Sequence, residues 1–151
     1  MTKSTASKRR ATPQKLYYGL DEQVGFILRQ VSQRHTTIFA NEIGVSLTAT
    51  QWAAMSKLAE TGPSSQNLLG RMTAMDVATI KGVIDRLTAR GLTETGPDPQ
   101  DGRRLLVKLT RAGQAMVDKA IPNALKVTEA TLAPLTPKER EVFVALLTKL
   151  R

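Results

Sequence analysis

Arginine, lysine and a single histidine are the side chains of this sequence that could do chemistry. The 151 residues hold no cysteine and only one histidine, His35, which excludes a disulfide framework, a thiolate metal site and a histidine cluster. A phosphate-binding glycine loop, an HExxH zinc motif and a serine nucleophile elbow are also missing. We therefore expect no enzyme, no metal and no cofactor.

Basic side chains are in excess. Lys and Arg number 22 against 13 Asp and Glu, for a formal net charge of +9. Such an excess on a small chain favours a polyanionic partner, either nucleic acid or an anionic membrane surface. No apolar run approaches the ~18 residues of a membrane span, and beyond the basic N-terminus no basic amphipathic helix is predicted. We therefore favour nucleic acid over a membrane, and expect the protein to be cytoplasmic.

Segment 1–15 carries much of the excess charge. It has no acidic residue, and its basic residues are Lys3, Lys8, Arg9, Arg10 and Lys15. Because the segment lacks apolar periodicity, we expect a disordered tail. It is either a solubilising appendage or an arm that lies along phosphates, and the sequence does not separate these two hypotheses.

The segment after Asp76 has two faces at helical spacing. Its apolar face consists of Ile80, Val83, Ile84 and Leu87, and its polar face of Ala78, Thr79, Lys81, Gly82 and Arg86. Small side chains let a helix approach base edges in the major groove, which is about 12 Å wide. Thr79 would meet a thymine methyl or a base edge, and Lys81 a guanine or a phosphate. The alternative is a solvated face, with Arg86 paired to Asp85 or to a carboxylate of the following hairpin. We expect Asp76 to be an N-cap.

The remaining elements follow from apolar periodicity and capping residues. Helices are predicted over residues 16–43, 48–62, 65–72 (with Ser64 or Ser65 as cap), 76–91, 110–132 and 136–150. Pro122 should kink or divide the fifth of these. Short strands are predicted at 92–95 and 105–109, joined by a tip rich in turn residues. The third and fourth helices form a helix-turn-helix, and the hairpin forms the wing of a winged helix.

The wing and the third helix supply further candidates. Arg103 is expected to enter a narrow minor groove, while Asp101 holds its guanidinium in one orientation. Arg104 is the second candidate at the tip. Ser64, Ser65 and Gln66 open the third helix, where backbone N–H groups could bind a phosphate.

Two stretches resemble the MarR family of bacterial winged-helix regulators. Residues 98–113 are similar to its wing signature, DP-x-D-x-R followed by L-V-x-L-T-x-x-G, and residues 69–92 to its helix-turn-helix. Residues 20–29 look most like the branch that governs aromatic-compound catabolism. The resemblance implies a homodimeric regulator of double-stranded DNA, most often a repressor released from a palindromic operator by a small aromatic ligand, carboxylate or phenolic. The alternative is an architectural protein that binds DNA independently of sequence.

We therefore expect a mainly α fold with a small β-hairpin. Residues 1–15 would be the tail, 16–46 an N-terminal dimerisation helix, 47–109 the winged helix-turn-helix lobe and 110–151 the C-terminal dimerisation helices. Apolar side chains near both ends need a cover, which a two-fold pairing would supply. These are Leu16, Tyr17, Leu20, Phe143, Leu146, Leu147 and Leu150.

The resemblance also implies an effector site where the dimerisation helices meet the lobe. The candidate residues are Arg29, Arg34, His35, Phe39, Trp52 and Met55. Together they could form an apolar slot with a cationic end, suited to an aromatic carboxylate. His35 and Trp52 could instead be core residues, and Arg29 and Arg34 simply exposed.

Overall fold

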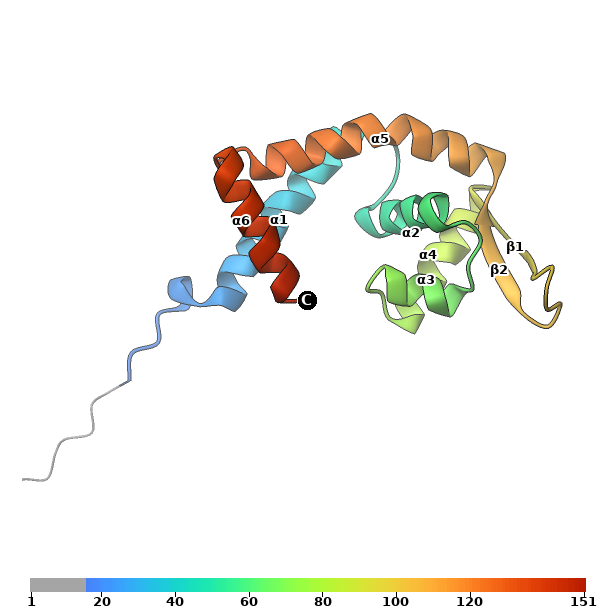
Figure 1. The fold of residues 1–151 in the computed structure, drawn as a ribbon, viewed down its shortest axis with the longest axis horizontal. Helices are drawn as coiled ribbons and strands as arrows, with labels where there is room; N and C mark the ends of the chain where they lie inside the picture. Colours follow the sequence, from blue (N-terminus) through green and yellow to red (C-terminus); the bar gives the residue numbers. More distant parts are fainter. Residues whose placement is uncertain (1–15) are drawn as a thin grey trace, which may run out of the picture.

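The computed structural model describes residues 16–151. The basic segment 1–15, which is the predicted tail, lies outside the described residues. Over this range the chain forms six α-helices and one antiparallel hairpin (Figure 1). In chain order the elements are η1 (a 3-10 turn, Leu20–Glu22), α1 (Val24–Glu42), α2 (Ala49–Thr61), α3 (Gln66–Met72), α4 (Val77–Ala89), β1 (Thr93–Pro97), β2 (Leu105–Leu109), α5 (Arg111–Leu132) and α6 (Pro137–Lys149). This arrangement confirms the mainly helical fold with a β-hairpin wing.

Local capping chemistry starts the helices after α1 at the predicted places. In each, the N-cap side chain accepts a hydrogen bond from a backbone N–H of the first turn, which satisfies an otherwise unpaired donor. The N-caps are Thr48, Ser65, Asp76, Thr110 and Thr136. Thr48 and Thr136 belong to full capping boxes, in which the side-chain oxygens of Gln51 and Glu139 accept from the N-cap backbone N–H.

The first helix is shorter than predicted. It begins after Gln23, whose backbone is extended and whose side-chain Nε2 donates to the Gly19 oxygen at 2.9 Å. The apolar residues before Gln23 therefore lie in the turn η1 and in an irregular segment and not in a helix. The reason is that the extended backbone at Gln23 interrupts the helical hydrogen bonds. The helix ends before Gly44, whose φ of +67° lies in the left-handed region that favours glycine.

Pro122 lies inside α5 without dividing it. The helix runs as one element from Arg111 to Leu132 and is gently arched (Figure 1). Because a proline has no N–H, the ladder bond to the carbonyl of Asp118 is absent at this point. The part of the prediction that allowed a division was wrong, since the hydrogen bonds on both sides keep the helix continuous.

Two clusters of buried side chains divide the core. The larger one fills the lobe of α2, α3, α4, the hairpin and the start of α5, and includes Met55, Leu69, Ile80 and Leu87. The smaller one joins α1 to α5 and consists of Phe39, Ile43, Ala120 and Val127. Val45 and Trp52 pack against both clusters. These two side chains therefore join the lobe to the helices outside it.

One glycine fixes how α5 leaves the hairpin. A Cβ placed on Gly113 would lie 2.0 Å from the Leu92 carbonyl oxygen, so the position admits no side chain. The Thr110 hydroxyl caps α5 and also donates to the Gly91 oxygen at 2.6 Å. The threonine and glycine of the motif therefore bring the start of α5 against the backbone that enters β1.

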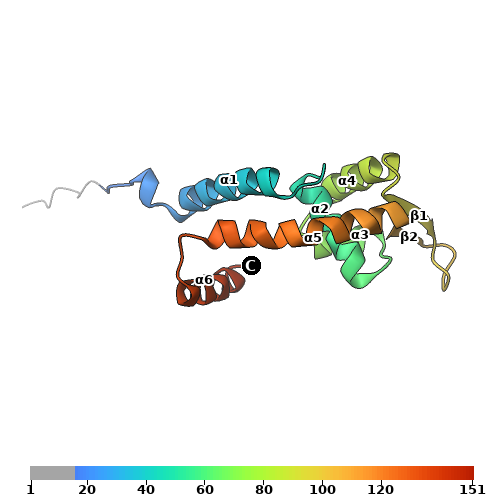
Figure 2. The same cartoon turned by 90° about the horizontal axis from the view of Figure 1, so that it is seen from above.

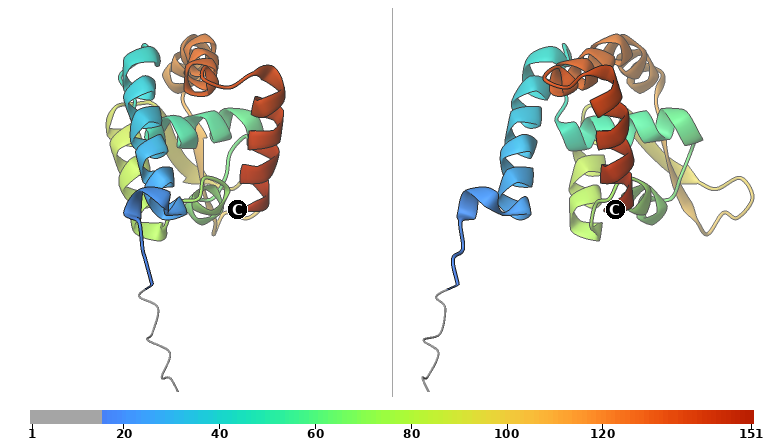
Figure 3. Two further views of the ribbon diagram at one scale, coloured as in Figure 1. Left: turned by 90° about the vertical axis from the view of Figure 1, so that its left-hand side faces the viewer. Right: turned by 60° about the vertical axis from the view of Figure 1, so that its left-hand side comes forward.

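The helices outside the lobe form an arm. The second half of α5 runs beside α1, and α6 turns back from the end of α5 (Figures 1 and 2). Figure 3 (left) shows α1 and α6 on opposite sides below the end of α5, and Figure 1 shows α6 standing away from the lobe. Within residues 16–151, α6 buries no side chain completely. Six of the predicted dimerisation residues are exposed and Phe143 is half-buried; the six are Leu16, Tyr17, Leu20, Leu146, Leu147 and Leu150.

Candidate functional site

The helix-turn-helix is tightly packed. A Cβ on Gly70 of α3 would come within 3.1 Å of both the Ile80 side chain and the Met75 oxygen. The turn between α3 and α4 contains Ala74, whose φ is +54°, an uncommon conformation for a residue with a side chain. The close approach of the two helices fixes the direction in which α4 presents its outer face.

Helix α4 begins at the predicted cap. The Asp76 Oδ1 accepts a hydrogen bond of 2.7 Å from the backbone N–H of Thr79. Hydrogen bonds from Thr79, first from its backbone and then from its side chain, hold the pKa of the Asp76 carboxyl below its usual value. Asp76 is therefore the N-cap of this helix, as the sequence predicts.

The outer face of α4 has the side chains expected of it. Ala78, Thr79, Lys81 and Arg86 are exposed, whereas the apolar face is buried in the lobe. Gly82 is half-buried, and the space where its Cβ would stand lies 3.7 Å from the Arg86 guanidinium. Asp85 pairs with Lys81, so the alternative in which it pairs with Arg86 was wrong.

One residue of this face was missed in the sequence. Val77 is the first residue of α4 and is 69% exposed. An apolar side chain at the start of such a helix can contact a thymine methyl group. The available signal was its position directly after the N-cap, where a helix side chain need not join the apolar stripe.

The wing tip is held by backbone hydrogen bonds. Asp98 N–H donates to the Arg104 oxygen at 2.8 Å, and Arg104 N–H donates to the Asp101 oxygen at 2.9 Å. Asp98 also accepts from Gln100 N–H at 2.9 Å, which makes it a turn residue. The tip lies at the end of the molecule far from α1 and α6 (Figure 1).

Asp101 acts on the backbone of the tip more than on the Arg103 guanidinium. Its Oδ1 accepts from Arg103 N–H at 3.1 Å, while the Arg103 Nε lies 3.6 Å away. The Arg103 side chain is 95% exposed and makes no bidentate pair. Asp101 therefore lies at ion-pair distance from the Arg103 guanidinium, as the prediction requires, and in addition holds the backbone of the turn. Arg104 is exposed beside it.

The start of α3 only partly matches the prediction. Ser65 is the N-cap and is half-buried, as is Gln66. Ser64 is buried, and its backbone forms an antiparallel bridge with Val107, with hydrogen bonds of 3.0 and 2.8 Å. The structure does not place the Ser64 side chain on the outer face, because residue 64 acts as a third, one-residue strand beside β2.

A cavity of about 240 Å³ lies where the arm meets the lobe, between α1, α2 and α5. It is lined by aromatic side chains and by small ones, and its polar groups are one imidazole and one hydroxyl. The residues are His35, Phe39, Ala49, Trp52, Ala124, Val127 and Thr128. Three of the predicted effector residues, His35, Phe39 and Trp52, are thus brought together. His35 is exposed, so it is not a core histidine.

The other three predicted effector residues lie elsewhere. Met55 is fully buried in the lobe core and does not line the cavity, although it lies one turn after Trp52 on α2. Arg29 borders a separate hollow near Tyr18 and Phe26. The Arg34 guanidinium donates to the carbonyl oxygens of Thr131 and Ala130 at 2.7 and 3.0 Å, where it caps the end of α5. The cavity therefore lacks the predicted cationic end.

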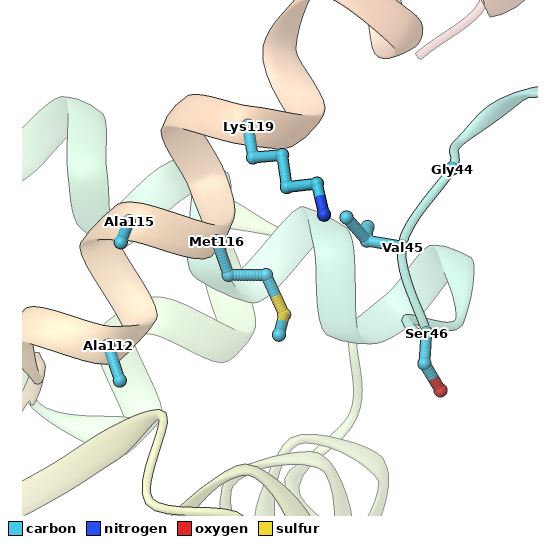
Figure 4. Close-up of a pocket in the computed structure, with 7 residues that line it drawn as sticks. All are labelled: Gly44, Val45, Ser46, Ala112, Ala115, Met116 and Lys119. Carbon is cyan, nitrogen blue, oxygen red and sulfur yellow. The ribbon is translucent and has the colours of Figure 1, made fainter.

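A second hollow, of about 410 Å³, lies between the α1–α2 loop and the first half of α5. Figure 4 shows Lys119 reaching toward Val45 above Met116, with Ser46 directed away. Ala112 and Ala115 complete the α5 wall. This hollow has no aromatic wall, which makes it a useful contrast to the α1–α2–α5 cavity.

The described residues 16–151 lack two features, a group of metal ligands and a helix able to cross a membrane. Among residues 16–151, no three or more His, Asp or Glu side chains are grouped as metal ligands. No helix in the same range combines the length and the apolar character needed to cross a membrane.

Comparison with known proteins agrees with this geometry. The sequence pattern described as "MarR family" matches residues 47–105. The HTH-type transcriptional repressor NicR of Pseudomonas putida is 42% identical over 134 residues, which are 88% of this chain and 85% of that protein.

Two solved structures are similar over most of the chain. A probable transcriptional regulator from Pseudomonas aeruginosa has 53% sequence identity and a TM-score of 0.86, covering 88% of this chain and 100% of its own. BpsR of Bordetella bronchiseptica, whose DNA binding is regulated by 6-hydroxynicotinic acid, has 41% identity and a TM-score of 0.84, covering 89% of this chain and 96% of its own. The protein therefore belongs to the MarR family, whose members are DNA-binding transcriptional regulators and not enzymes.

Proposed function

We propose that this protein is a homodimeric repressor that a small aromatic ligand releases from a palindromic operator. The observation that carries the proposal is the position of Trp52. Its side chain lines the α1–α2–α5 cavity and packs against both core clusters. A ligand that favours one placement of this side chain would favour one placement of the arm relative to the lobe.

DNA recognition would use α4 and the wing. The exposed Thr79 and Lys81 would contact base edges in the major groove, and Arg103 would enter the adjacent minor groove. NicR is named a repressor, which supports repression over activation.

Pairing of two chains would use the arm. Leu16, Tyr17 and Leu20 near one end and the exposed stripe of α6 near the other are large apolar surfaces in a single chain. Two-fold pairing would cover both and set two α4 helices about 34 Å apart, one turn of the duplex. Light scattering should give twice the 16.5 kDa of one chain. A monomer at micromolar concentration would contradict the proposal.

Binding to the upstream region of the protein's own gene tests sequence specificity. We expect a footprint with two-fold symmetry, and binding at least ~10³-fold tighter than to random duplex at the same salt. A ratio near one would indicate an architectural DNA-binding protein instead.

Two matched variants locate the ligand. Ala49 lines the α1–α2–α5 cavity and Ala112 lines the hollow of Figure 4. Both residues are exposed in the first turn of a helix, so Ala49→Leu and Ala112→Leu should leave folding and operator binding intact. Titration with 6-hydroxynicotinic acid should release the operator from wild type and from Ala112→Leu, but not from Ala49→Leu. The opposite pattern would place the ligand in the hollow of Figure 4.

A further inference from the structure

A chain of two hydrogen bonds joins His35 to α5 and favours one position for the hydrogen of its imidazole. The Thr131 hydroxyl donates to the Val127 carbonyl oxygen at 2.8 Å, and the His35 Nδ1 lies 2.9 Å from the same hydroxyl oxygen. A carbonyl oxygen can only accept, so the single hydroxyl hydrogen of Thr131 is used there. With the hydroxyl hydrogen directed to Val127, the Thr131 oxygen accepts from His35 and Nδ1 is the donor.

The other ring nitrogen follows from this assignment. A neutral imidazole has one N–H, so Nε2 of neutral His35 carries a lone pair and accepts hydrogen bonds. Among residues 16–151, Nε2 makes no hydrogen bond. The imidazole thus offers the α1–α2–α5 cavity an acceptor whose character is set by Thr131, a residue 96 positions away.

The surroundings of His35 carry little competing charge. None of the cavity residues contributed by α2 and α5 is charged. The neighbouring Arg34 has its guanidinium on the α5 carbonyl oxygens. The aromatic rings of Phe39 and Trp52 fit a flat ring, and Thr128 is the other polar side chain of the wall.

We infer that His35 Nε2 accepts a hydrogen bond from the ligand, which is therefore an aromatic ring bearing an O–H or N–H donor. This inference rests on the proposed function and specifies its ligand class. A ring that instead turned a carboxylate toward Nε2 would need a hydrogen on that nitrogen. An imidazole that keeps its Nδ1 hydrogen gains this second hydrogen only by taking up one proton, so proton uptake identifies this second mode of binding.

Calorimetry with 6-hydroxynicotinic acid and nicotinic acid tests the inference on the full-length protein. The two rings differ by one donor, present as an O–H or as the N–H of the lactam form. Losing that donor leaves the acceptor unpaired, so we expect wild type to bind nicotinic acid about tenfold more weakly. Titrations of 6-hydroxynicotinic acid at neutral pH in phosphate and Tris buffers should show uptake of no proton.

Two variants separate the acceptor from its support. His35→Phe keeps a flat ring without nitrogen and should bring the ratio of the two affinities close to one. Thr131→Val leaves the imidazole free to place its hydrogen on either nitrogen, so about half of the molecules would keep the acceptor. The affinity for 6-hydroxynicotinic acid should then fall about twofold, while that for nicotinic acid should not. Thermal melting of each variant checks folding.

Each result has a distinct meaning. Equal binding of the two acids by wild type, or uptake of one proton, contradicts the role of His35 while leaving a ligand-released repressor intact. A tenfold ratio of the two affinities that persists in His35→Phe also contradicts the role of His35. If His35→Phe binds neither acid, Thr131→Val decides instead: an unchanged affinity for 6-hydroxynicotinic acid in that variant contradicts the role of His35. Failure of wild type to bind either acid contradicts the proposed ligand itself, and the inference falls with it.

Discussion

Lys81 and Asp85 form an ion pair of 2.6 Å on the exposed face of α4, one helical turn apart. Both side chains are more than half exposed, so the pair adds little stability. It does hold the ammonium group over the outer face of the helix. DNA would have to compete with Asp85 for this group, and Asp85 would itself lie close to the phosphates.

Replacing Asp85 should therefore strengthen DNA binding. We expect Asp85→Asn to bind the operator and random duplex more tightly, whereas Lys81→Ala should weaken binding and relax the preference at one position of each half-site. Both variants should keep their unfolding free energy within about 0.5 kcal/mol. Fluorescence anisotropy with single-base operator variants makes the measurement. Lys57→Ala, which breaks the 2.6 Å pair with Glu60 on α2, is the matched control.

The wing tip provides a second prediction. Arg103→Ala should weaken binding to operators with A·T-rich flanks and leave stability within about 0.5 kcal/mol, because the side chain is exposed in a turn. Gln100→Ala at the same tip should bind DNA as wild type does. Asp101→Ala should also weaken binding, since it removes the acceptor for Arg103 N–H. If Arg103→Ala binds A·T-rich and G·C-rich flanks like wild type, Arg103 has no part in the interface.

The packing at Gly113 predicts a large loss of stability. Gly113→Ala would place a methyl group 2.0 Å from the Leu92 oxygen, and we expect a cost of about 3 kcal/mol or more in urea unfolding. Gly25→Ala is the control, because nothing lies within 4 Å of a Cβ at that position in α1. It should stabilise the protein by about 0.5 kcal/mol. Equal stabilities of the two variants would show that α5 can move away from the hairpin.

Helix capping predicts a dependence on acid. The Asp76 and Glu139 carboxyls have pKa values below their usual 3.8 and 4.5, because Thr79 and Thr136 respectively donate hydrogen bonds to them. A lowered pKa in the folded state stabilises the protein above the unfolded value, and this contribution is lost as the pH falls through the folded value. We therefore compare the urea midpoint of wild type with that of the Asp76→Asn, Glu139→Gln double variant. The difference between the two midpoints should shrink as the pH falls below the ordinary carboxyl pKa values of 3.8 and 4.5. A constant difference would contradict the linkage.

The basic segment 1–15 gives a prediction about phosphates. If it lies along the DNA, each lost contact lowers the slope of log affinity against log salt by about 0.9. Deleting it should lower the slope by several units per dimer and weaken specific and random binding alike. The specificity ratio should hold, since Thr79, Lys81 and Arg103 remain. An unchanged slope would make the segment a solubilising tail, and a collapsed ratio would mean that it reads sequence.

Apart from the start of α1, the sequence by itself determined the helix ends and the α4 face. A cap such as Asp76 bonds to Thr79, three residues away, and Gly44 ends α1 through its own φ. These interactions lie within one turn of the chain, so residue types at short spacing are sufficient to predict them. The outer face of α4 follows from the same helical period. Val77 escaped prediction although its position directly after the N-cap was an available signal, because its apolar side chain was not separated from the apolar stripe.

Only the tertiary structure decided which residues share a cavity. Ser64 is buried because Val107 of β2 pairs with it. Met55 faces the lobe core, whereas Trp52 on the same helix lines the cavity. His35 gains its acceptor nitrogen from Thr131, 96 residues later. Periodicity shows that a helix has an inner face, but contacts across such separations depend on how α1, α2 and α5 cross. That crossing depends on the packing of side chains such as Trp52, which contacts both core clusters.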